Sequence, residues 1–285
     1  MINIKSRDTS GIQIYLQSLA IPSAKSHKGQ NGKVLVIGGS HLFHAASIWA
    51  AEVASHFADM VHYCSTAENN EIMRSLKTSF RNGIVVPRSV MRDYVQEDDA
   101  ILIGPGMVRT GDEATVTETV TRSLLETFPM KRFVLDAGAL QMMKAEWLID
   151  MKEKTIVTPH QQEFAQLFGR DVTDLSLEEK AQAVSAAARA HNTVILLKAI
   201  VDIVSDGDET IIIEGGNAGL TKGGTGDILA GLVTALRSKN DPVTSAVLGS
   251  FLLKRAGDEL FQKKGTWYNN SDLIGSIPEV LNSLL

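Results

Sequence analysis

Residues 223–233 have the sequence Gly-Gly-Thr-Gly-Asp-Ile-Leu-Ala-Gly-Leu-Val, a glycine-rich segment that runs directly into a stretch with helical spacing. Its apolar residues, with Leu236, form one stripe along a helix. Because glycine is unfavourable inside a helix, we assign the glycines to the turn that opens it. Such a turn presents free backbone N–H groups and the positive end of the helix dipole, which together bind anions. We therefore predict a phosphate site at Gly223, Gly224, Thr225 and Gly226.

Asp227 lies beside this predicted phosphate site, where a carboxylate is unfavourable unless it has a task. The task we expect is to accept a proton from a substrate hydroxyl while the N–H groups stabilise a phosphoryl group. The alternative is that Asp227 simply interacts favourably with the helix dipole. The surrounding glycines, which include Gly215 and Gly216, favour the catalytic role.

Short apolar runs rich in β-branched residues recur along the chain. Most lack strict alternation of apolar and polar residues, which is typical of parallel strands covered by helices on both faces. Helical segments are predicted between them, at 45–57 and 176–191, and Thr158-Pro159 predicts a helix with proline at its first position. The apolar runs are residues 34–37, 61–64, 84–86, 101–103, 133–135, 155–157 and 194–197.

This order of elements predicts an α/β fold with a mostly parallel sheet between two layers of helices. Residues 201–204 and 210–213 flank Ser205-Asp206-Gly207-Asp208 and predict an antiparallel hairpin near one edge of the sheet. We find no repeat or linker, so we expect residues 1–285 to form a single domain. Residues 1 to about 25 are expected to form a helix packed on it.

Composition limits the classes of partner and compartment. A formal net charge of −5 argues against a nucleic-acid-binding surface, which is normally basic. Cys64 is the only cysteine, so no intramolecular disulfide can form, and a reducing compartment fits best. The N-terminus has no apolar signal-peptide region, and no segment has the length of a membrane span. We expect a soluble, cytoplasmic protein.

The segment from Gly216 to Asp227 resembles the signature of the NAD(P)H-hydrate dehydratases, which are ribokinase-like nucleotide repair enzymes. Four further segments resemble the family in the expected order, so that the resemblance extends over residues 27 to 237. The chain differs from the family pattern at His44, Ala199 and Ala218. The four segments are residues 27–40, Gly104-Pro105-Gly106, residues 135–140 and Thr158-Pro159-His160 with Glu163, Phe164 and Leu167.

The resemblance implies a ribokinase-like fold and a reaction. The 6S hydrate of NADH or NADPH is phosphorylated on its ring hydroxyl, and phosphate is then eliminated to restore the double bond. By the same resemblance Asp227 contacts the hydroxyl, and Ala45, Gly106 and His160 contact the hydrate. The adenine nucleotide is bound by Gly226 together with Lys198, Ala199, Ile200, Val201 and Asp202.

The resemblance also implies Mg²⁺, ADP in preference to ATP, a homotetramer, and a separate epimerase for the 6R hydrate. Two other functions stay open: a ribokinase-like small-molecule kinase that leaves the phosphate on an alcohol, and a nucleotide sensor without catalysis. Asp136 either caps the following turn or reaches a Mg²⁺ ion, and the cap is favoured. The spacing of His41 and His44 indicates no protein-bound metal.

Overall fold

A computed structural model describes all residues from Met1 to Leu285. Its centre is one ten-stranded sheet in the order β1-β10-β9-β8-β7-β6-β5-β2-β3-β4. The strands are β1 (Ile2–Lys5), β2 (Lys33–Ile37), β3 (Met60–Cys64), β4 (Gly83–Val85), β5 (Ala100–Ile103), β6 (Arg132–Leu135), β7 (Ile156–Val157), β8 (Val194–Leu197), β9 (Asp202–Ser205) and β10 (Thr210–Glu214).

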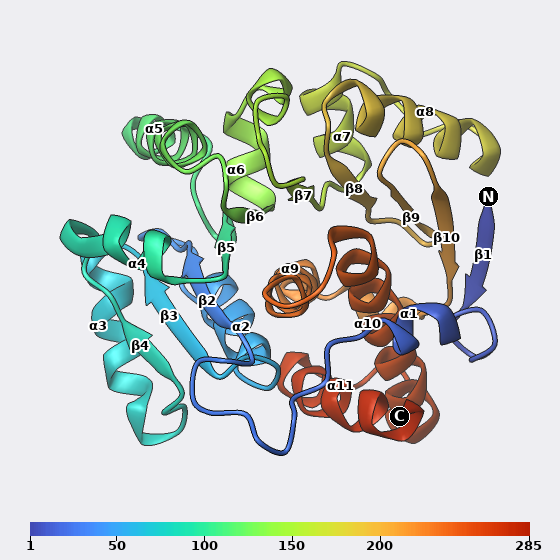
Figure 1. Cartoon of the computed structure of the whole chain (residues 1–285), viewed down its shortest axis with the longest axis horizontal. Coiled ribbons are helices and arrows are strands. Elements are labelled where there is room, and N and C mark those ends of the chain that lie inside the picture. Colours follow the sequence, from blue (N-terminus) through green and yellow to red (C-terminus); the bar gives the residue numbers. More distant parts are fainter.

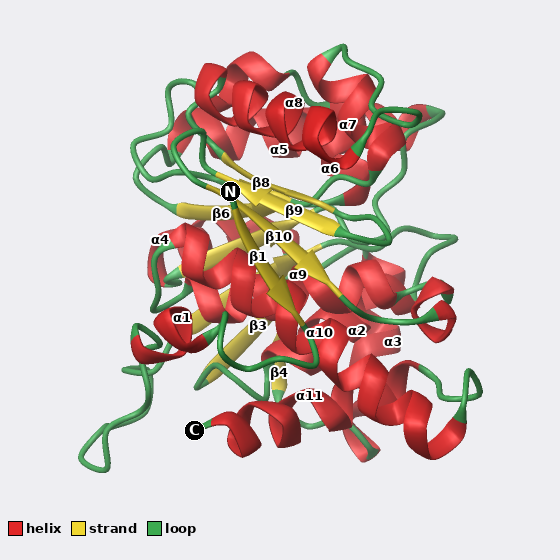
Figure 2. Ribbon diagram, turned by 90° about the vertical axis from the view of Figure 1, so that its right-hand side faces the viewer, coloured by secondary structure: helices red, strands yellow, loops and turns green.

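Helices cover both faces of this sheet (Figure 2). On one face α9 lies under the middle of the sheet, where Figure 1 shows it end-on. The helices are α1 (Gln13–Gln17), α2 (Ala45–Ala54), α3 (Ala67–Ser75), α4 (Met91–Glu97), α5 (Asp112–Thr127), α6 (Ala137–Met142), α7 (Gln161–Phe168), α8 (Leu177–Ala190), α9 (Thr225–Arg237), α10 (Pro242–Lys264) and α11 (Asn270–Leu284). None of them combines the length and the apolar character needed to cross a membrane.

The uninterrupted apolar strands supply two cores at once. Successive residues of a strand point to opposite faces of the sheet. Val34 and Val36 of β2 therefore join the 42-residue core under α2, α9, α10 and α11, while Leu35 and Ile37 join the 31-residue core under α5, α6 and α8. The predicted three-layer fold with a mostly parallel sheet is confirmed.

The predicted hairpin is present near one edge of the sheet, with one further strand outside it. β9 and β10 pair antiparallel, and β1 adds outside β10 in parallel register, with Ile2 opposite Ile211. Residues 1–25 are therefore not one helix, as we predicted, but a strand followed by the five-residue helix α1. The unpaired edge of β10 explains this difference, because its backbone N–H and C=O groups gain hydrogen bonds when residues 2–5 pair with it as β1.

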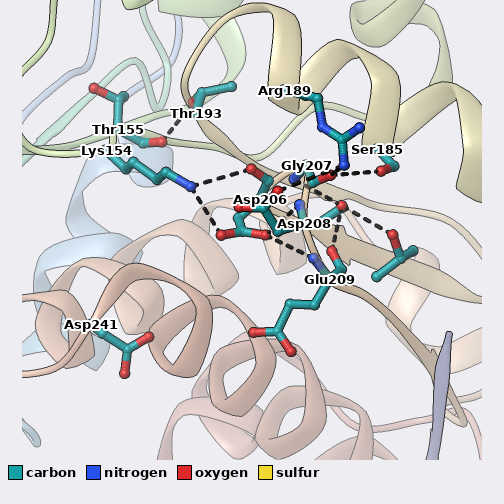
Figure 3. Close-up of polar contacts among 12 residues, drawn as sticks. Lys154, Thr155, Ser185, Arg189, Thr193, Asp206, Gly207, Asp208, Glu209 and Asp241 are labelled. Atoms are coloured by element: carbon teal, nitrogen blue, oxygen red, sulfur yellow. Dashed lines mark hydrogen bonds and ion pairs between the residues drawn. The ribbon is translucent and has the colours of Figure 1, made fainter.

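The turn of the hairpin is fixed by side chains from two neighbouring elements (Figure 3). Lys154 Nζ lies 2.9 Å from the Asp206 carboxylate, and Arg189 of α8 donates to the carbonyl of Gly207. Gly207 has a φ of +96°, and an added Cβ would lie 2.7 Å from the backbone of Arg189. The turn therefore requires glycine at this position.

The start of α7 also differs from our prediction. The helix begins at Gln161, and its N-cap is His160, not Thr158. Pro159 consequently lies outside the helix, in the strand-to-helix turn, where its fixed φ is compatible with extended backbone. Its carbonyl accepts a hydrogen bond from the Lys198 amide at 2.8 Å, as part of an isolated parallel bridge between His160 and Lys198 beyond the paired residues of β7 and β8.

Candidate functional site

The predicted site residues follow neighbouring parallel strands. β2, β5, β6, β7 and β8 run parallel, so their carboxyl ends lie along one edge of the sheet. Gly106, Asp136, His160 and Lys198 follow β5, β6, β7 and β8 respectively. In open α/β sheets this edge is where ligands usually bind.

The glycine-rich turn opens α9 as predicted. Gly224 is the N-cap residue, with a φ of +100°, and Asp227 is the third residue of the helix. An added Cβ at Gly224 would lie 2.3 Å from both the Trp49 ring and the Asn270 amide. Asn270 Nδ2 also donates to the carbonyl of Gly223 at 2.9 Å. The turn is thus held from α2 and α11, and its conformation requires glycine.

Lys198 and Asp136 form the closest ion pair at this edge. Lys198 Nζ lies 2.6 Å from Asp136 Oδ1, and the Thr158 hydroxyl donates to the same oxygen at 2.8 Å. Asp136 occupies the N-cap position of α6, but its side chain makes no capping hydrogen bond. Our preferred cap role for Asp136 is therefore wrong, because the lysine and the threonine take its carboxylate.

Lys198 also reaches the predicted phosphate site. A Cβ built on Gly226 would lie 3.4 Å from Lys198 Nζ. Burial alone would lower the pKa of Lys198, but Asp136, Glu163 and Asp227 raise it overall. The ammonium therefore stays charged beside the first turn of α9, where it adds to the positive end of the helix dipole.

Asp227 is held in an unusual electrostatic state. Burial and the nearby Asp136 carboxylate raise its pKa to about 7, while Lys198 acts in the opposite direction. A carboxyl group whose pKa lies near neutral pH can both accept and release a proton under working conditions. Perturbed carboxyl groups in a cleft are also characteristic of functional sites.

Asp227 lies in the wall of a cavity of about 790 Å³. Gly106 lines the same cavity, as do the loop after β2 and the first turn of α6. From α2, Ala46 lines the cavity, whereas Ala45 does not. The lining comprises residues 41–43, Ala46, residues 106–113, Ala137, Gly138, Gln141 and Asp227. A second cavity, of about 450 Å³ between residues 19–31 and α11, contains none of the predicted site residues.

Residues 198–201 form the turn between β8 and β9, and Asp202 is the first residue of β9. Asp202 Oδ1 accepts from the Ala199 amide at 2.9 Å, and Oδ2 accepts from Ser250 at 2.7 Å. Lys254 Nζ donates to the Ile200 carbonyl at 3.0 Å. Asp202 and Lys254 therefore stabilise the turn itself, while the Ile200 side chain is 92% exposed.

Comparison with known proteins places this geometry in a family. The family model for NAD(P)H-hydrate dehydratase matches residues 34–279. The chain belongs to this family. The ADP-dependent (S)-NAD(P)H-hydrate dehydratase of Cenarchaeum symbiosum is 33% identical over 276 residues, which cover 92% of this chain and 93% of that protein. The chain spans about half the length of several other relatives, which are bifunctional NAD(P)H-hydrate repair enzymes.

Solved structures show the same fold. A ribokinase-like superfamily protein from Enterococcus faecalis superposes with a TM-score of 0.84 at 21% identity, over 99% of this chain and 96% of that one. The ADP/ATP-dependent NAD(P)H-hydrate dehydratase from Bacillus subtilis, co-crystallised with ATP/Mg²⁺, gives 0.78 at 23% identity, over 96% and 97%. The predicted ribokinase-like fold is confirmed.

Sequence reasoning left three residues of this edge without a role. Glu163 and Gln141 are joined by a hydrogen bond of 2.8 Å, and Lys254 braces the 198–201 turn from α10. Glu163 follows His160 by three residues, which is the spacing of a capping box, so this role had a sequence signal. Gln141 and Lys254 had none, because each acts on a segment that is distant in sequence.

Proposed function

We propose that the chain dehydrates the 6S hydrate of NADH or NADPH, with ADP or ATP as the phosphoryl donor. The observation that carries this proposal is the position of Asp227. Its partly buried carboxyl group lies in the wall of the 790 Å³ cavity and also in the first turn of α9, beside Lys198. A substrate hydroxyl in the cavity and a phosphate at the glycine turn would meet at this residue.

The residues have complementary tasks in this reaction. Asp227 would take the proton of the ring hydroxyl as its oxygen attacks the terminal phosphorus of the nucleotide. The Gly223–Gly226 turn and Lys198 would stabilise the charge that develops on the phosphoryl oxygens. With ADP the products are AMP, inorganic phosphate and the restored dinucleotide. Phosphate leaves far more readily than hydroxide, and the ring nitrogen supplies the electron pair that expels it. Loss of a proton from the adjacent ring carbon to water then restores the double bond.

The substrate side is assigned to Gly106 and His160, and the nucleotide side to residues 198–202. Gly106 lines the cavity with Asp227. His160 is connected to the cavity through Glu163 and the lining residue Gln141. Ala45 begins α2, one residue before the lining residue Ala46, so we assign its contact to the backbone at the start of that helix.

The protein residues do not by themselves form a metal site. No group of three or more His, Cys, Asp or Glu side chains is placed to hold a metal ion. Mg²⁺ commonly binds through one or two carboxylates plus the phosphates of a substrate. We therefore propose that Mg²⁺ enters with the nucleotide, and we assign it no protein ligand.

Product analysis tests this function against a small-molecule kinase. The purified chain is incubated with the 6S hydrate, Mg²⁺ and either ADP or ATP, and absorbance of the reduced nicotinamide ring and free phosphate are measured together. Equal yields of phosphate and reduced dinucleotide support the proposal. A stable phosphorylated alcohol without free phosphate would establish the kinase instead. Comparing the two nucleotides tests our preference for ADP.

Two further proposals concern assembly and partners. We propose a homotetramer, which light scattering coupled to size exclusion would test directly. Because the proposed reaction uses one epimer of the hydrate, we also propose that a separate epimerase activity converts the 6R form. Full consumption of a mixture of epimers only after addition of an epimerase would support this.

A further inference from the structure

His160 uses one ring nitrogen to cap a helix. Its Nδ1 accepts hydrogen bonds from the backbone amides of Gln162, at 3.2 Å, and Glu163, at 3.3 Å. A nitrogen that accepts cannot carry a proton, so in the neutral ring the proton is on Nε2. The two backbone hydrogen bonds at the N-terminus of α7 thus select the tautomer with the proton on Nε2.

The Nε2–H group has no hydrogen-bond partner in the protein. The nearest carboxylate oxygen, Glu163 Oε1, lies 3.5 Å away, and the His160 side chain is 48% exposed. The N–H is therefore free to donate to a bound molecule. A nearby carboxylate attracts an imidazole N–H. Glu163 therefore favours the ring orientation in which Nε2–H lies on the same side as its carboxylate.

The Glu163 carboxylate is fixed from two directions. Oε2 accepts from the His160 backbone amide at 3.0 Å, and Oε1 accepts from Gln141 Nε2 at 2.8 Å. The Glu163 side chain is only 5% exposed, so it has little freedom to move. Gln141 lines the cavity that contains Gly106 and Asp227. A continuous set of contacts therefore connects the cavity wall to the ring of His160.

We propose that Glu163 is a positioning residue. Together with Gln141 and the first turn of α7, it holds the His160 ring in the tautomer and orientation in which Nε2–H donates to an acceptor oxygen of the bound hydrate. The identity of this ligand rests on the proposed function, but the state of the ring does not. The two ideas can therefore fail separately.

His160→Asn separates capping from donation. Asparagine is a favourable N-cap, and its Oδ1 can accept from the same backbone amides, but it has no N–H at the position of Nε2. We expect the thermal midpoint of the folded protein to stay close to wild type. The KM for the hydrate should rise about tenfold, the effect of one lost hydrogen bond, with the KM for ADP unchanged. A normal KM for the hydrate in this variant would show that His160 is only a cap.

Glu163→Gln tests the positioning residue. Glutamine can still accept from the His160 amide, as capping boxes allow, but its NH₂ group faces the donor groups of Gln141 and His160. We expect a rise in the KM for the hydrate similar to that of His160→Asn, and no further rise when both changes are combined. The matched control is Glu179→Gln in the capping box of Ser176 at α8, which should leave both KM values unchanged.

Nitrogen NMR of the His160 ring supplies a readout that needs no substrate. The wild-type ring should show a protonated Nε2 and an unprotonated Nδ1, and Glu163→Gln should give a mixture or a broadened signal. A protonated Nδ1 in the wild type, or an unchanged ring in Glu163→Gln, would overturn the inference. If the ring has the expected form but the enzyme does not act on the hydrate, the proposed function fails and the positioning of His160 by Glu163 is retained.

Discussion

Replacing Asp227 with asparagine should remove turnover and stabilise the fold at the same time. Burial and the Asp136 carboxylate raise the pKa of Asp227 from 3.8 to about 7. Between these two pH values the folded protein holds a proton that the unfolded chain has released. The stability of the wild type therefore falls as the pH rises through this interval and stays low above pH 7. Asparagine does not ionise, so the stability of the variant does not fall over this pH interval.

The size of the gain follows from the pKa. Raising a carboxyl pKa from 3.8 to about 7 corresponds to a penalty of up to about 4 kcal/mol for the ionised group above pH 7. The side chain is not completely enclosed, so we expect a measured gain of about 1–3 kcal/mol at pH 8. Near pH 4 the two proteins should be equally stable. The loss of the base should lower kcat by about 100-fold or more.

Two measurements on the same protein samples test this reasoning. Denaturant unfolding at several pH values between 4 and 8 gives the stability difference, and the hydrate assay with ADP gives kcat. Asp150→Asn, at an exposed position outside the cavity, is the control and should change neither quantity. A variant that is less stable than wild type at pH 8 would refute the electrostatic argument. Near-normal turnover would remove Asp227 from the catalytic role.

Three further substitutions test separate parts of the structure. Gly226→Val should abolish ADP binding in calorimetry while the protein stays folded, because its side chain would extend from a Cβ that already lies 3.4 Å from Lys198 Nζ. Gly104→Ala should destabilise the fold by about 3 kcal/mol or more in denaturant unfolding, because its Cβ would lie 1.7 Å from the Asp136 carbonyl oxygen and its φ is +130°. Lys154→Met should cost about 0.5–1 kcal/mol in the same measurement and leave turnover unchanged, because it removes the 2.9 Å pair with the Asp206 carboxylate and the 3.3 Å hydrogen bond to the Asp206 carbonyl, both far from the site (Figure 3).

Local sequence signals predicted most of the fold because strand and helix periodicity is a local property. Val34 to Ile37 is apolar at every position, and each residue is indeed buried against helices on one face or the other. β1 was missed because Ile2–Lys5 is short, and because its partner β10 lies about 210 residues away along the chain. No pattern within residues 1–25 indicates that part of this segment pairs with the free edge of β10.

The same difference between local signals and contacts distant in sequence applies to the candidate site. The turn at Gly223–Gly226 could be predicted because glycine spacing and the following apolar stripe are neighbours in sequence. The role of Asp136 could not, because an aspartate after a strand is normally a cap, and its actual partner Lys198 is 62 residues away. Likewise, His160 could be singled out from its position before a helix, but which ring nitrogen is free depends on the backbone geometry of α7.

The charges at this edge also bear on how a nucleotide can bind. Three carboxylates, those of Asp136, Glu163 and Asp227, act on the single ammonium of Lys198, and Asp136 already holds it at 2.6 Å. The phosphates of ADP would add further negative charge to a site that has no excess positive side chain. Lys254 cannot supply it, because its ammonium donates to the Ile200 carbonyl and lies 3.4 Å from Asp202. Backbone N–H groups at the start of α9 offset part of this repulsion. The remainder supports the proposal that the nucleotide enters as its Mg²⁺ complex, so that the counter-charge arrives with the phosphates.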